Sequence, residues 1–169
     1  MLHIIIDGYN LIHASRGTDD DWTQLSLEKA RNALVGFLLS KRKERRERIT
    51  VVFDGSSGMY PRESSPHGVE VLFSEAGVTA DTVICHMVES APNPRTILVV
   101  SDDRQIKAAA VKAGAKPLAS RTFLRESHKA AEKRRRAGPP EPREKFDGTK
   151  PGDVQRWRKV LGLDEGEAK

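Results

Sequence analysis

The stretch LHIIIDGYN, residues 2–10, indicates the fold more clearly than any other part of the chain. Residues 2–6 are continuously hydrophobic, which is typical of a strand that is buried on both faces of a parallel sheet. The run stops at Asp7 and Gly8, a common turn pair, and we expect Tyr9 and Asn10 to lie on the following loop. The stretch therefore predicts a central strand that delivers a carboxylate to one edge of a sheet.

The rest of the chain alternates between short apolar runs and segments of helical periodicity. Further strands are predicted at 49–53, 69–73 and 96–100, with a short one in KPLA at 116–119. Helices are predicted for about 20 residues from Thr23, from a cap at Thr79, over 103–115 with an end at Gly114, and from about residue 121. This alternation predicts an α/β fold, a single Rossmann-like three-layer domain with a mostly parallel central sheet.

The composition fits one domain with a short extension. The chain has 169 residues, of which 37% are hydrophobic, enough for one core. We expect the domain to cover residues 1–137. Residues 138–169 begin rich in proline and glycine and are expected to form a linker, a short C-terminal helix and a tail. The apolar face of that helix would carry Val154, Trp157, Val160 and Leu161.

Cysteine usage and hydropathy limit the environment of the protein. The single cysteine, Cys85, excludes an internal disulfide and fits a reducing compartment. There is no run of about 18 apolar residues and no basic leader before the first hydrophobic segment. These features predict a soluble, cytoplasmic protein without a membrane partner.

Positive charge is concentrated in the last third of the chain. Residues 1–120 hold 15 Lys and Arg against 15 Asp and Glu, whereas residues 121–169 hold 14 against 9. The densest part, RTFLRESHKAAEKRRR at 121–136, predicts a basic helix that attracts a polyphosphate such as RNA. An ordinary solvated helix face is the alternative interpretation, and the sequence leaves it open.

Acidic residues follow the predicted strands at the same end of each. Asp7 and Asp54 come directly after a strand, and the pair Asp102 and Asp103 begins one residue after a strand. Asp81 opens the helix after the third strand. Parallel strands end at one edge of the sheet, so these carboxylates should share that edge. Each has a local alternative as a turn or cap residue; Ser101 or Asp102, for example, would cap the helix after the fourth strand. Together they would repel one another unless a hard cation such as Mg²⁺ or Mn²⁺ neutralised them.

Polar and basic residues near this edge are candidates for contacts with RNA. Asn10 would orient a water molecule or a ligand carboxylate, or would simply tie down the turn. The basic candidates for holding the RNA backbone are Arg104 beside the acids and, on the basic helix, Arg121 and Arg125. Tyr60 and Arg62, in the long loop after the second strand, are weaker candidates.

Several motifs together resemble the YacP-like NYN family, a branch of the PIN-like metal-dependent nucleases. They are DGYNLI after the first strand, VVFDG around the end of the second, TADTVI at a helix start, and VVSDDRQI followed by GA and a FL pair. The likeness covers about residues 1–130, in order. Where the family commonly has a second acid after the helix-opening aspartate, this chain has Thr82.

The resemblance implies a PIN-like domain with endoribonuclease activity that depends on Mg²⁺ or Mn²⁺. Asp7, Asp81 and Asp102 match the acidic metal-binding positions of the family, and Asp103 is a further candidate ligand. Such a site would hydrolyse RNA phosphodiester bonds with a metal-activated water. Some relatives act on messenger RNA in association with ribosomes, so messenger RNA and the ribosome are the implied partners.

Two other classes of protein are alternatives. The first is a non-catalytic RNA- or ribosome-binding protein, in which the basic helix carries the function. The second is a phosphatase of the haloacid-dehalogenase type, which also places an aspartate after its first strand. That chemistry requires a second aspartate two residues later, where this chain has Tyr9, so the sequence disfavours it.

Overall fold

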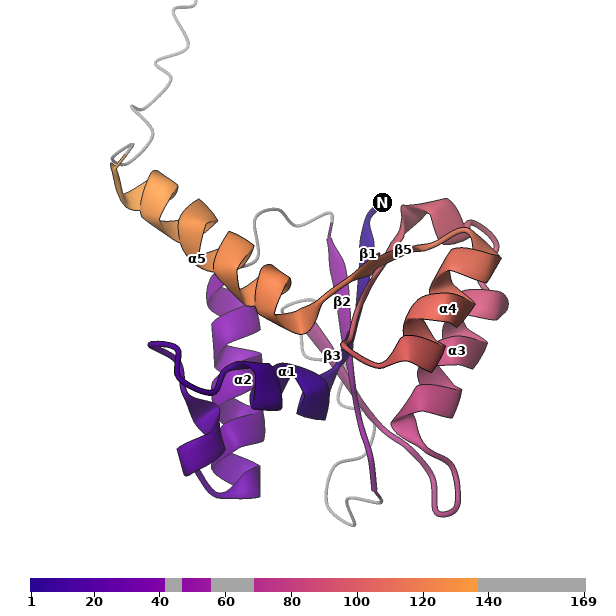
Figure 1. Cartoon of the computed structure of the whole chain (residues 1–169), viewed down its shortest axis with the longest axis horizontal. Helices are drawn as coiled ribbons and strands as arrows, with labels where there is room; N and C mark the ends of the chain where they lie inside the picture. The colour runs from indigo at the N-terminus through magenta and orange to yellow at the C-terminus, as the bar shows by residue number, and fades with distance from the viewer. Residues whose placement is uncertain (42–46, 56–68, 137–169) are drawn as a thin grey trace, which may run out of the picture. The chain divides into compact units, whose positions relative to one another are not determined.

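A five-stranded parallel sheet is the centre of the computed structural model, which describes residues 1–41, 47–55 and 69–136. The strands are β1 (His3–Asp7), β2 (Arg48–Phe53), β3 (Val69–Phe73), β4 (Ile97–Val100) and β5 (Lys116–Leu118). Their order in the sheet is β3-β2-β1-β4-β5, and every neighbouring pair is parallel (Figure 1). The predicted α/β fold is confirmed.

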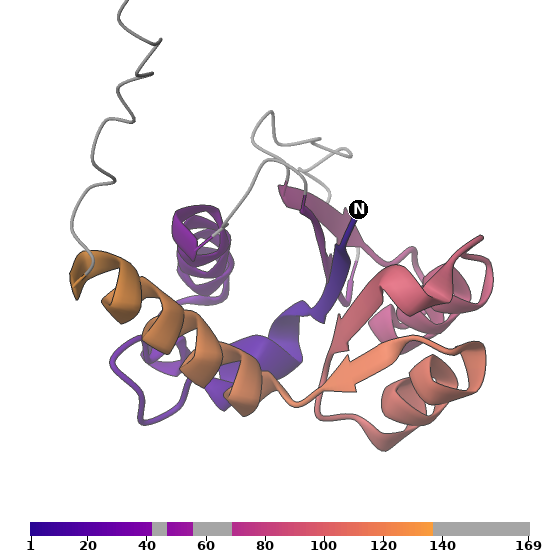
Figure 2. The ribbon, with the colours of Figure 1, turned by 90° about the horizontal axis from the view of Figure 1, so that it is seen from above.

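Helices cover both faces of the sheet. They are α1 (Gly8–Ala14), α2 (Leu27–Lys41), α3 (Ala80–Glu89), α4 (Arg104–Ala113) and α5 (Ser120–Arg136), with short 3₁₀ helices η1 (Trp22–Gln24) and η2 (Pro94–Thr96). Figure 2 shows α1, α2 and α5 on one face and α3 and α4 on the other. A compact unit covers Met1–Glu132. None of the helices in the described part of the chain has the length and hydrophobicity that a membrane span requires.

Two hydrophobic cores separate the three layers, as the side-chain alternation of the strands requires. Ile4 and Ile6 of β1 face the core under α1, α2 and α5. Ile5, between them, faces the core under α3 and α4. Both faces of β1 are therefore buried, which explains the apolar run at Ile4, Ile5 and Ile6.

Helix α5 is anchored to the first core near its start. Leu124 is buried, with 1% of its surface exposed. The ring of His128 lies 5.5 Å from that of Phe37, between centroids, and its Nε2 lies 3.0 Å from Oδ2 of Asp20. The first turns of α5 thus pack against the first core.

Two local expectations were wrong. Tyr9 and Asn10 lie in α1 rather than on a loop, because Asp7 is the N-cap of a helix that begins at Gly8. The helix predicted from Thr23 begins at Leu27 and is preceded by the separate turn η1. That turn is capped by Asp21, whose Oδ1 accepts a hydrogen bond from the backbone N of Thr23 at 3.0 Å.

Some predictions fall outside the described residues. They are the linker, C-terminal helix and tail at 138–169, and Tyr60 and Arg62 in the long loop. The predicted domain boundary at residue 137 stays a prediction.

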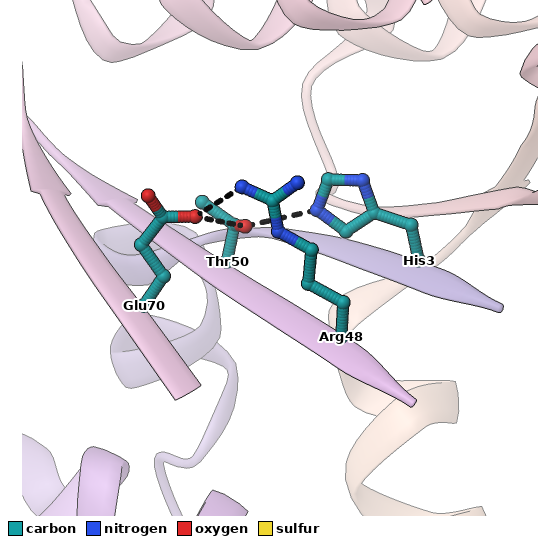
Figure 3. Close-up of polar contacts among 4 residues, drawn as sticks. All are labelled: His3, Arg48, Thr50 and Glu70. Carbon is teal, nitrogen blue, oxygen red and sulfur yellow. Dashed lines mark hydrogen bonds and ion pairs between the residues drawn. The ribbon is translucent and has the colours of Figure 1, made fainter. Parts of the chain in front are cut away.

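A polar network ties β1, β2 and β3 together at the edge where these strands begin (Figure 3). The Thr50 hydroxyl donates to Glu70 Oε2 at 3.2 Å and accepts from His3 Nε2, 2.9 Å away. Arg48 Nη2 donates to the same Glu70 oxygen at 2.8 Å. Burial and then the Arg48 charge lower the pKa of His3. This network lies at the opposite edge of the sheet from Asp7 and Asp54, which stand where β1 and β2 end.

Candidate acidic site at the C-terminal edge of the sheet

Acidic side chains gather where the parallel strands end. Asp7 is the last residue of β1, Asp54 follows β2, and Asp81 lies in the first turn of α3. Asp102 and Asp103 lie between β4 and α4. The predicted grouping of these acids at one edge of the sheet follows directly from the observed topology.

Asp7 is the most enclosed of these acids, with 4% of its surface exposed. Its Oδ1 accepts a hydrogen bond from the backbone N of Asn10 at 3.1 Å. Its Oδ2 accepts from the Asn10 side-chain amide and, at 3.3 Å, from the Ser101 hydroxyl. Burial raises the pKa of Asp7 above its ordinary value; the hydrogen bonds oppose this, and the charge of Asp54 adds to it.

Asp81 is electrostatically coupled to the other acids. Burial raises its pKa, and the charges of Asp103, Asp7 and Asp54 raise it further. Three carboxylates from separate segments of the chain therefore act on Asp81 at this edge. A cation beside Asp7 and Asp81 would offset the burial and the negative charges that raise their pKa values.

The two acids after β4 have different surroundings. Asp103 is the N-cap of α4, and its Oδ1 accepts from the backbone N of Gln105 at 2.6 Å and of Ile106 at 3.0 Å. Asp102 is exposed, and its Oδ1 accepts at 3.2 Å from the backbone N of Ser120, the first residue of α5. The expectation that Ser101 or Asp102 would cap the helix after β4 was wrong.

The donor set matches a hard divalent cation in its chemistry, since it consists of carboxylate oxygens. Within residues 1–41, 47–55 and 69–136, no three His, Cys, Asp or Glu side chains lie together as a ready metal-binding group. Oδ1 of Asp103 and Oδ1 of Asp102 are engaged with backbone N–H groups, which leaves one oxygen of each without a described partner. The ligand set of Asp7, Asp81, Asp102 and Asp103 stays a prediction.

The residues predicted to contact RNA lie around these acids and on α5. Asn10 uses its amide to hold Asp7, and Arg104 is exposed as the first residue of α4. Arg121 is exposed and donates from Nη2 to the backbone O of Arg16 at 3.1 Å. Arg125 is exposed, with Nε 3.5 Å from Glu126 Oε1. Both α5 arginines face solvent, so their role in RNA binding stays a prediction.

Sequence reasoning missed a cluster of one arginine and three aromatic rings beside the acids. The guanidinium of Arg31, from α2, lies over three rings, at 5.5 Å from the centroids of Tyr9 and Phe53 and 5.1 Å from that of Phe73. It donates to the Tyr9 hydroxyl from Nε, at 3.1 Å, and from Nη2. The only sequence clue is that Phe53 and Phe73 both end a predicted strand.

Comparison with known proteins agrees with this fold. Residues 4–158 match the family described as the YacP-like NYN domain. The chain therefore belongs to the YacP-like NYN domain family, a nuclease-type domain.

Solved structures extend the comparison. The crystal structure of Rae1 (YacP) from Bacillus subtilis is 27% identical over 96% of this chain and 92% of that one, with a TM-score of 0.63. A second crystal structure, of a tryptophan-to-leucine mutant of the same Bacillus subtilis protein, is 28% identical over 80% of each chain, with a TM-score of 0.64. No curated protein matches the sequence.

Proposed function

We propose that this protein is a metal-dependent endoribonuclease that hydrolyses RNA phosphodiester bonds. One observation carries the proposal: carboxylates from separate segments meet at the C-terminal edge of the sheet closely enough for their charges to raise the pKa of Asp81. Membership in a nuclease-type family supports it. We further propose messenger RNA as the substrate, the ribosome as a partner and the cytoplasm as the location, as the family resemblance implies.

The proposed ligands of Mg²⁺ or Mn²⁺ are Asp7, Asp81, Asp102 and Asp103. When bound, such an ion supplies positive charge to the phosphodiester in its transition state and makes a water molecule more acidic. Asn10 and Ser101 hold the Asp7 carboxylate in one orientation through their hydrogen bonds. Positioning the central carboxylate in advance reduces the reorganisation needed when the site is loaded.

Basic residues around the site would hold the substrate. Arg104 stands directly beside Asp103 in the chain, and Arg121 and Arg125 present charge on the exposed side of α5. Contacts of this kind bind the sugar–phosphate backbone and give affinity rather than choice of sequence. We therefore expect binding of many single-stranded RNAs, with any preference set by the context in which RNA is presented.

The test compares cleavage of RNA, free and in translating complexes, by the wild-type chain and by Asp7→Asn and Asp81→Asn. Each substitution keeps the shape of the side chain and removes one ligand charge, so we expect cleavage to fall by at least about 100-fold. Glu89→Gln is the matched control, because it removes a carboxylate from α3 about 12 Å further along the helix than Asp81. Calorimetric titration with Mn²⁺ gives a second readout, and heat of binding should be lost in Asp7→Asn.

Two results would contradict the proposal. Unchanged cleavage in both aspartate variants would place the chemistry elsewhere. RNA binding without cleavage and without Mn²⁺ binding would instead support the alternative of a non-catalytic RNA- or ribosome-binding protein.

A further inference from the structure

Arg31 differs from the other described basic residues in that its guanidinium lies over aromatic rings. Its guanidinium lies over the rings of Tyr9, Phe53 and Phe73 and donates twice to the Tyr9 hydroxyl. Within the described part of the chain, no carboxylate oxygen lies within ion-pair distance of it. A partly buried guanidinium thus lies at the edge where the acids lie, and no carboxylate of the described residues pairs with it.

The rings fix this cation at one position. Tyr9 packs edge-on against Phe53 with 5.2 Å between centroids, and Phe53 stacks on Phe73 at 5.6 Å. Phe53 is fully buried and immediately precedes Asp54, while Tyr9 lies two residues after Asp7. The three rings therefore attach the guanidinium to the ends of β2 and β3 and to the first turn of α1, beside the acids.

A stacked guanidinium that has no carboxylate partner among the described residues is well suited to bind a phosphate. Its planar fork matches two phosphate oxygens, and stacking reduces the entropy lost when those hydrogen bonds form. The Tyr9 hydroxyl accepts from Nε and Nη2, so Nη1 has no described partner. The acids at this edge repel a polyanion, and a fixed positive charge on their flank would offset that repulsion.

We propose that Arg31 binds a phosphate of the RNA backbone on the β2–β3 side of the acidic site, with Tyr9 as the residue that positions it. The proposal rests on the proposed nuclease function for its ligand class. The competing explanation is structural: Arg31 would only join α2 to the sheet through its ring contacts.

Salt dependence of RNA binding distinguishes the two explanations. Fluorescence anisotropy measures the affinity for a short single-stranded RNA, in the presence of EDTA so that no cleavage occurs, over a series of salt concentrations. The logarithm of the association constant falls linearly with the logarithm of the salt concentration, and loss of one phosphate contact reduces the steepness of that line by about 0.7 for a single strand. We expect this decrease in Arg31→Gln and Arg31→Met, together with about tenfold weaker binding at low salt.

The variants separate charge from packing. Arg31→Met keeps an unbranched apolar stem on the rings, which preserves packing if Arg31→Gln fails to fold. Arg31→Lys keeps the charge and should retain the wild-type slope while binding more weakly. The matched control is Arg95→Gln, which removes an exposed arginine of η2, just before β4, at the opposite edge of the sheet. Its slope should equal that of the wild type.

A wild-type slope in folded Arg31→Gln or Arg31→Met would overturn the proposal and leave Arg31 a structural residue. A loss of slope in Arg95→Gln equal to that in Arg31→Met would do the same. The outcome is independent of the catalytic assignment, because no step of this assay uses cleavage. Failure of the aspartate variants to lose cleavage would refute the proposed function without changing the salt slopes.

Discussion

Replacing Gly8 with alanine should destabilise the protein by a steric conflict that the structure defines. An ideal Cβ on Gly8 would lie 2.3, 2.5 and 2.8 Å from three carbon atoms of the Phe53 ring. Carbon atoms pack at about 3.5–4.0 Å, so the ring would have to move by about 1 Å or more. Phe53 has none of its surface exposed and packs against Tyr9 and Phe73, so the ring has no free space to enter.

The expected cost is about 1–3 kcal/mol in free energy of unfolding, the usual range for overpacking a close-packed core. For a chain of this size that corresponds to a decrease in Tm of about 2–12 °C. Urea unfolding followed by circular dichroism measures the free energy. In a Phe53→Leu background, where the conflicting ring is absent, the same substitution should cost about 1 kcal/mol less.

Gly36→Ala is the matched control. Gly36 lies inside α2, and nothing lies within 4 Å of a Cβ built on it. Alanine should therefore stabilise the helix by about 0.5–1 kcal/mol, the opposite sign to Gly8→Ala. If Gly8→Ala is as stable as the wild type, or if Phe53→Leu does not relieve it, the proposed conflict between α1 and β2 does not exist.

Two further predictions concern other parts of the fold. Leu124→Ala should cost about 2–5 kcal/mol in urea unfolding because the Leu124 side chain of α5 is buried in the first core. Val111→Ala, at a side chain 62% exposed, should change stability by less than about 0.5 kcal/mol. Equal effects would refute the anchoring of α5. Burial raises the pKa of Glu70, but Arg48 and the Thr50 hydroxyl outweigh it and hold that pKa below its ordinary value of 4.5. Folding thus favours the ionised form of Glu70, and the wild type should be more stable than Glu70→Gln by less than about 1 kcal/mol. This difference in the free energy of unfolding should be constant above about pH 5.5 and shrink as the pH falls through the lowered pKa. A difference that grows on acidification would refute this prediction.

The candidate site was predictable in its location but not in its internal contacts. The position of Asp7, Asp54 and Asp81 at one edge follows from the parallel direction of the strands, which the alternation of strands and helices in the sequence predicts. The hydrogen bonds that hold Asp7 come from Asn10, three residues away, and Ser101, 94 residues away. Only the first lies within the range of local sequence patterns.

The sequence by itself determined the alternation of strands and helices, because burial on both faces of β1 requires an unbroken apolar run and helix faces require a 3.6-residue period. Tertiary structure decided where α1 begins and that Asp103, rather than Ser101 or Asp102, caps α4. It also decided that Arg31 meets Tyr9, Phe53 and Phe73. The starts of α1 and α4 depend on the capping hydrogen bonds of Asp7 and Asp103, which the periodicity of apolar side chains does not indicate. The Arg31 cluster depends on contacts between segments more than 20 residues apart in the chain, and these arise only when the layers pack.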